Sequence, residues 1–154
     1  MKFFIIGIFI VGSTIAVACP NLSGTYNENG DDGTLTLKVE QTGCEHIALT
    51  FSFVSNGQQS PSMTLSYETD GKEHNETNYN MHLEPDESMK YACEYLGERF
   101  QRTDMYNHKS TGYSSWAIDT LFLDSKGNLI GDQTKGDSNG YSGSTHDVFV
   151  RVKK

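Results

Sequence analysis

The chain has 154 residues and a formal net charge of −8 at pH 7, from 20 acidic and 12 basic side chains. A net negative charge argues against nucleic acid and anionic lipid as partners, because both require a basic surface. The length suits a single domain, which can bury roughly two thirds of the surface of its unfolded chain.

The first 18 residues have the pattern of a secretory signal peptide. Lys2 precedes an apolar run over residues 3–11, and the segment ends in Ala16-Val17-Ala18. A basic start, a short apolar stretch and an A-x-A site are typical of such peptides. The apolar run is shorter than the about 20 residues that a transmembrane helix needs. We therefore expect cleavage after Ala18 and a secreted or periplasmic domain over residues 19–154.

The rest of the chain alternates apolar and polar residues in short segments. Successive side chains of a strand point to opposite faces, so each segment is expected to have one dry and one wet face. Parallel strands, buried on both faces, would give continuous apolar runs instead. The alternating apolar residues are Leu35, Leu37 and Val39; Ile47, Leu49, Phe51 and Phe53; Met63, Leu65 and Tyr67; Tyr79, Met81 and Leu83; Met89, Tyr91, Cys93 and Tyr95; and Val148, Val150 and Val152.

Turn-forming residues such as Asn56-Gly57 and Asp70-Gly71 separate these segments. We expect a hairpin between Trp116 and Ile130, two strands between Tyr91 and Tyr106, and a polar loop from Thr134 to Thr145. The pattern predicts an all-β domain, a single antiparallel up-and-down meander β-barrel of about 8–10 strands. Closure into a barrel would remove the sheet edges. A β-sandwich is the alternative.

Three cysteines, Cys19, Cys44 and Cys93, lie in the part expected to be exported, where disulfides persist. In a meander all three fall near one end, so Cys19–Cys44 and Cys44–Cys93 are both feasible, and we favour the first. Cleavage after Ala18 would make Cys19 the first residue. The alternative to a free secreted protein is therefore a lipoprotein anchored through acylated Cys19, which would leave an even pair of cysteines.

The segment Leu22-Ser23-Gly24-Thr25-Tyr26 resembles the first barrel strand of calycin-type proteins, the lipocalins and their relatives. These families begin with Gly-x-Trp, and an arginine from a late strand packs across the aromatic ring. The resemblance implies that Tyr26 and Arg151 close one end of the barrel, with a cation on an aromatic face. Tyr26 stands where tryptophan is expected, and the chain ends in a strand instead of the C-terminal helix of lipocalins.

The sequence has no Gly-x-Ser-x-Gly motif, no cysteine beside a catalytic partner and no paired histidine spacing typical of zinc sites. We therefore expect no enzymatic activity, no cofactor and no metal.

The inward positions suggest a cavity for a small apolar or planar ligand. The alternative is that these side chains fill the interior of the barrel. We thus predict a monomeric, lipocalin-like binding protein, or else a filled barrel that acts as an adhesion, inhibitor or other protein-interaction module through the loop over residues 134–145. The candidate cavity residues are Phe51, Phe53, Tyr67, Tyr79, Tyr91, Tyr95 and Trp116, together with Met63, Met81 and Met89.

Overall fold

The computed structural model describes residues 19–30, 33–77 and 83–152. The expected signal peptide and two candidate cavity residues, Tyr79 and Met81, lie outside these ranges. In the described ranges, no helix is long and apolar enough to cross a membrane. The strands are β1 (Gly24–Gly30), β2 (Gly33–Thr42), β3 (His46–Ser55), β4 (Gln58–Gln59), β5 (Met63–Glu68), β6 (Glu73–Asn75), β7 (Glu87–Leu96), β8 (Arg99–His108), β9 (Tyr113–Leu123), β10 (Leu129–Asp137) and β11 (Ser142–Arg151).

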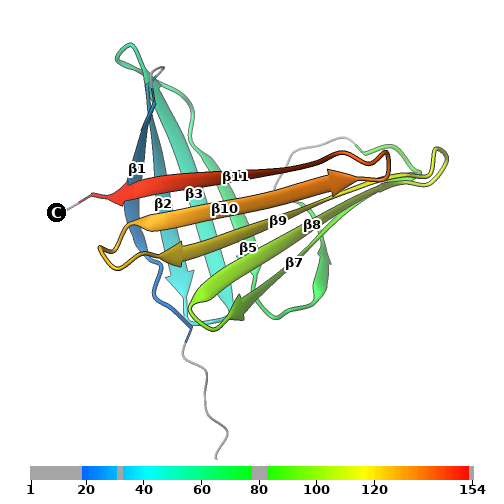
Figure 1. Cartoon of the computed structure of the whole chain (residues 1–154), viewed down its shortest axis with the longest axis horizontal. Helices are drawn as coiled ribbons and strands as arrows, with labels where there is room; N and C mark the ends of the chain where they lie inside the picture. Colours follow the sequence, from blue (N-terminus) through cyan, green and yellow to red (C-terminus); the bar gives the residue numbers. More distant parts are fainter. Residues whose placement is uncertain (1–18, 31–32, 78–82, 153–154) are drawn as a thin grey trace, which may run out of the picture.

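The strands form one antiparallel sheet in the order β4-β3-β2-β1-β11-β10-β9-β8-β7-β6, with β5 paired to β3. Most neighbours in the sheet are also neighbours in the sequence, and β1 pairs with β11, which brings the two ends of the domain together. Figure 1 shows β1, β2 and β3 running at a steep angle to β7–β11. The predicted all-β, up-and-down barrel meander is confirmed.

The expectation that the barrel is fully closed is wrong. Among the described residues, no strand ladder joins β5 to β6 or β7. The chain between β5 and β6 is held by two backbone hydrogen bonds, in which the Thr69 N–H donates to Glu45 O and the Gly71 N–H donates to Cys93 O, each at 2.9 Å. The strands thus form two groups, β1–β5 and β6–β11, which meet at this end of the sheet. We call it the closed end. From there the groups diverge, as the long free ends of β7–β11 show (Figure 1).

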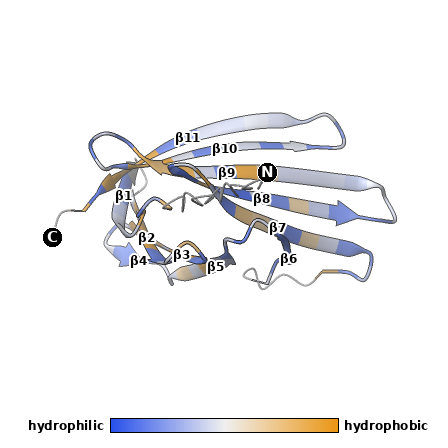
Figure 2. Cartoon of the chain, turned by 90° about the horizontal axis from the view of Figure 1, so that it is seen from below, coloured by the Kyte–Doolittle hydropathy of each residue, from blue (hydrophilic) through white to orange (hydrophobic). Residues whose placement is uncertain are grey.

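The hydrophobic core lies at the closed end and draws on both groups of strands. Figure 2 shows hydrophobic segments where the groups meet, whereas the far ends of β8–β11 are neutral or hydrophilic. The expected alternation is confirmed in β2, β3, β5 and β7, whose inward residues are the core members. The buried cluster comprises Leu22, Tyr26, Leu37, Val39, Ile47, Leu49, Leu65, Tyr67, Tyr91, Cys93, Phe100, Leu121, Leu129 and Phe149.

The last strand has the opposite phase from the one expected. Val148, Val150 and Val152 are 42%, 54% and 43% exposed, whereas Phe149 is buried. The register pairs Phe149 with Leu129, a fully buried residue of β10, and so turns the valines outward. Both phases of this strand carry apolar residues, so alternation alone could not choose between them.

The polar loop expected over Thr134–Thr145 is also wrong, because β10 and β11 extend across most of it. Only residues 138–141 connect the two strands. The Asp137 carboxylate accepts the N–H groups of Asn139 and Tyr141 at 2.8 and 3.1 Å, and Gly140 has a φ of 88°. This φ suits glycine in a tight turn.

Candidate functional site

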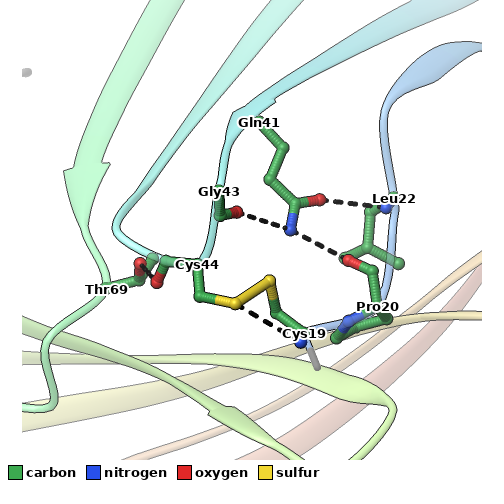
Figure 3. Close-up of a disulfide and its surroundings, with 7 residues drawn as sticks. All are labelled: Cys19, Pro20, Leu22, Gln41, Gly43, Cys44 and Thr69. Carbon is green, nitrogen blue, oxygen red and sulfur yellow. Dashed lines mark hydrogen bonds between the residues drawn. A yellow bond between two sulfur atoms is a disulfide. The ribbon is translucent and has the colours of Figure 1, made fainter. Parts of the chain in front are cut away.

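The closed end is fastened by a disulfide between Cys19 and Cys44 (Figure 3). This confirms the favoured pairing. Cys93 is a free, buried thiol, so the alternative Cys44–Cys93 pairing is wrong. Burial raises the pKa of the Cys93 thiol to about 12. A disulfide between structural cysteines indicates an oxidising environment.

The Gln41 side chain holds the N-terminal segment beside this disulfide. Its carbonyl accepts the Leu22 N–H at 3.0 Å, and its amide donates to Pro20 O at 2.9 Å and Gly43 O at 3.2 Å (Figure 3). One amide thus satisfies three backbone groups from two separate segments. The disulfide and Gln41 together fix the chain that leads into β1.

Next to the disulfide and Gln41, the side chain of Arg151 lies close to Tyr26 and Gly24. The Arg151 guanidinium lies 5.5 Å from the centre of the Tyr26 ring and donates to Ser23 O at 2.7 Å. The Tyr26 hydroxyl donates to Leu22 O at 2.8 Å, and burial raises its pKa. A Cβ atom at Gly24 would lie 3.0 Å from the Tyr26 ring, so this position needs glycine for the close approach. This is the arrangement that the resemblance implied for Tyr26 and Arg151.

A cleft of about 710 Å³ opens between the two groups of strands, beyond the core. Its volume falls within the roughly 300–1,000 Å³ of small-molecule pockets. The wall from β2, β3 and β5 is apolar and consists of Leu37, Leu49, Phe51, Met63 and Leu65. Space remains here because the strands diverge, so the side chains do not fill the whole interior.

The opposite wall, from β8–β11, carries charged and polar side chains beside apolar ones such as Phe100, Leu121 and Phe149. Arg102 and Asp104 are only 7% and 8% exposed and form a bidentate ion pair. In this pair Arg102 Nε donates to Asp104 Oδ1 at 2.9 Å, and Nη2 donates to Oδ2. The guanidinium also lies 4.7 Å from the centre of the Tyr67 ring. Burial raises the pKa of Asp104, although Arg102 opposes this effect. Beside the pair, the Asp119 carboxylate accepts a hydrogen bond from Gln133 Nε2 at 2.7 Å.

Aromatic residues of β8 and β9 stand at the outer part of this wall. The rings of Tyr106 and Tyr113 lie 6.0 Å apart, and the Tyr106 hydroxyl donates to Glu87 Oε1 at 2.5 Å. This hydrogen bond raises the pKa of Tyr106 to about 12 and lowers that of Glu87.

The sequence did not identify the polar wall. Phe100 of β8 lies in the core, so Arg102 and Asp104 further along β8 lie on the same inward face. The register pairs Arg102 with Cys93 of β7 and with Asp119 of β9, so Asp119 shares this face. In the sequence, these residues look like the wet face of a strand. The signal that could have located them is the phase of Phe100, which shares its face with residues 102, 104 and 106.

The predicted cavity residues do not all lie at one site. Phe51 lines the cleft, as do Met63 and Met89 from the accompanying methionines. Tyr67 and Tyr91 lie in the core, with ring centres 5.0 Å apart.

Tyr95 lies elsewhere, at a smaller 260 Å³ depression beside Cys19 and Cys44. Its buried hydroxyl has no hydrogen-bond partner among the described residues. Burial raises the pKa of Tyr95 to about 12.

Three predicted interior residues are exposed, and one of them, Met63, is 47% exposed although it lines the cleft. Phe53 is inward in phase but 37% exposed, because it lies where the two groups of strands have already diverged. Trp116 borders the cleft, yet its register with Gly136 and Met105 puts its side chain on the outer face, where it is 43% exposed. Its indole lies over Gly136, where a Cβ atom would come within 2.9 Å of the ring. The role of Trp116 in a ligand site therefore stays a prediction.

Neither family models nor curated proteins match this sequence. Among solved structures, the chain resembles the crystal structure of a mutant of the fluorescent protein UnaG, with a TM-score of 0.50 and 12% sequence identity. The match covers 86% of this chain and 96% of that chain. At this identity the likeness concerns the fold alone. The domain therefore has the fold of a distant lipocalin or calycin-type barrel, open along one seam.

Proposed function

We propose that this protein is an exported, non-enzymatic binding protein whose cleft holds a small ligand with substantial apolar surface. The observation that carries the proposal is the 710 Å³ cleft with an uninterrupted apolar wall from β2, β3 and β5. Pockets of this size and character are typical of small-molecule sites.

Export is supported by the signal-peptide pattern of residues 1–18 and by the Cys19–Cys44 disulfide. We favour release over lipid anchoring. The Cys19 sulfur is used in the disulfide, and the same sulfur cannot also carry a thioether-linked lipid.

The alternative of a filled barrel acting through its loops loses its main support. That hypothesis depended on a long polar loop over residues 134–145, and the strands leave only residues 138–141 between them. The cleft also argues against a filled interior.

The test uses the neutral, apolar probe N-phenyl-1-naphthylamine, whose fluorescence rises when it leaves water. We expect saturable binding to the mature protein and at least about tenfold weaker binding by Gly131→Val. Gly131 lies on the inner wall, and a Cβ there would make ordinary contacts of 3.5 Å with Phe149 and 3.6 Å with Leu121, so added methyl groups occupy cleft volume without backbone strain.

The matched control is Thr134→Val, which makes an isosteric change on the exposed face of the same strand. It should bind the probe like the unmodified protein. If Gly131→Val fails to fold, Ala117→Phe fills the same cleft from β9. No saturable binding, or equal loss in the cleft and control variants, would overturn the proposal.

A further inference from the structure

The charges around the cleft are unbalanced. Two basic and five acidic residues line it. They are Arg102 and Lys135, and Asp104, Asp119, Asp132, Asp137 and Asp147.

Some of these charged groups already have partners. Asp104 neutralises Arg102 within the buried pair, and Asp132 is hydrogen-bonded to His146, with 2.5 Å between Oδ1 and Nδ1. Asp137 accepts backbone N–H groups in the turn between β10 and β11, and Lys135 is exposed. Among the acidic side chains that line the cleft, Asp119 and Asp147 have neither an ion-pair partner nor a backbone N–H donor within the described residues.

Asp119 and Asp147 are both half-buried on the inner wall. Asp119 receives a hydrogen bond from Gln133, a neutral group, and no cation of the described chain lies within ion-pairing distance of either carboxylate. The Asp119 charge also acts on its surroundings, because it contributes to the raised pKa of Asp104.

The floor beside these carboxylates is open. Gly131 lies between Leu121 and Asp147 in the sheet register, and Asp119 stands in the next inward row, opposite Gln133. Because Gly131 has no side chain, a ligand group can approach the sheet at this point. The facing wall offers only Leu37, Leu49, Phe51, Met63 and Leu65.

A ligand that covers this wall removes water from both carboxylates. An unpaired carboxylate taken from water is costly, and a cation held in hydrogen-bonding geometry offsets that cost. A purely apolar ligand supplies no such group. We propose that the cleft binds an amphiphilic cation, with an ammonium or amidinium group held at Asp119, on the same inner wall as Asp147, and its apolar body against the wall from β2, β3 and β5.

This inference rests on the proposed function and specifies its ligand class. The test compares octylamine, octanol and octanoate, which share one alkyl chain and differ in the charge of the head group, by isothermal titration calorimetry at pH 7 and constant ionic strength. Octylamine should bind at least about tenfold more tightly than octanol, as expected for one charge-assisted hydrogen-bonded pair, and octanoate should bind most weakly.

The variant Asp119→Asn keeps the size of the side chain and an acceptor for Gln133 but removes the charge. It should weaken octylamine about tenfold and change octanol less than twofold. The control is Glu40→Gln, which removes the same charge from an exposed position paired with Lys38 at 2.7 Å. It should change neither ligand more than twofold.

The two proposals fail in different ways. If octanol binds as tightly as octylamine, or if Asp119→Asn weakens both equally, the cationic ligand class is wrong while the cleft remains a binding site. If none of the three compounds binds and N-phenyl-1-naphthylamine does not bind either, the proposed function itself is wrong. Circular dichroism establishes that each variant is folded before its affinity is interpreted.

Discussion

At the scale of single residues, the inner wall depends on Arg102. Its guanidinium neutralises Asp104 and lies over the Tyr67 ring, and both members of the ion pair are nine-tenths buried. Replacing Arg102 by leucine leaves a buried carboxylate without its cation, which typically costs about 3–5 kcal/mol. We expect Arg102→Leu to lower the free energy of unfolding in urea by about that amount at pH 7.

The pH dependence of this variant separates loss of charge from loss of packing. Burial raises the pKa of Asp104, so protonation of this carboxyl favours the folded state, and this effect grows once Arg102 is absent. The stability of Arg102→Leu should therefore recover as the pH falls and be lost as the pH rises through the folded-state pKa. The double variant Arg102→Leu, Asp104→Leu should be more stable than the single variant at pH 7. Equal stability of the two, with no recovery in acid, would contradict the prediction.

The sequence predicted the apolar inner residues well and the polar ones poorly. Leu37, Leu49 and Tyr67 were identified because period-2 alternation reflects the burial of one face of each strand. The same rule fails at Arg102 and Asp104, since it assumes that a polar residue faces water. Their place inside follows from the pairing of β8 with β7 and β9, a long-range property that local alternation does not contain.

At the scale of elements, the N-terminal segment is attached to the β2–β3 hairpin by one disulfide and one glutamine. The Cys19–Cys44 bond closes a sequence separation of 25 residues, for which the loss of chain entropy in the unfolded state predicts a stabilisation of roughly 3 kcal/mol. We expect the variant Cys19→Ser, Cys44→Ser to lose about this much in urea unfolding, independently of reductant.

The unmodified protein should lose a similar amount on treatment with dithiothreitol. Cys93→Ala is the control, because this thiol is free, and its stability should still respond to the reductant. A double variant as stable as the unmodified protein would show that the Gln41 hydrogen bonds alone hold the segment.

The sequence predicted this disulfide from the placement of strand ends, but it did not predict the hairpin of β10 and β11. In its outer half, this hairpin has few apolar residues on either face, because one face borders an open cleft and the other faces solvent. A strand with two wet faces resembles a loop in composition. Backbone pairing over eight residue pairs from Leu129↔Phe149 to Gly136↔Ser142 defines it instead.

At the scale of the whole molecule, the open seam explains how a meander with a well-packed core also retains a cleft. The core closes one end, where Tyr67 packs edge-on against Tyr91. Beyond this point β5 pairs with β3 alone among the described strands, whereas β9 is paired along most of its length on both sides. Local stability should follow the same division.

Amide hydrogen exchange measures this division directly. Local opening frees strands that have few partners before it frees those paired on both sides. We expect the protected amides of β5 and β6 to exchange at least about tenfold faster than those of the middle of β9. Tyr67→Leu, which removes the ring contact with Tyr91 at the seam, should accelerate exchange in β5 and β6 further and change the central amides of β9 by a smaller factor.

A ligand held between the two walls should have the opposite effect, because it joins β3 and β5 to β8–β11 across the cleft. Saturating octylamine should slow exchange in β5 more than in β9, since β9 is already protected by its own ladders. Uniform exchange across β5 and β9 would mean that both open only with the whole domain, and the seam would then not be the weak side of the barrel. Slowing confined to residues outside the cleft would place the ligand elsewhere.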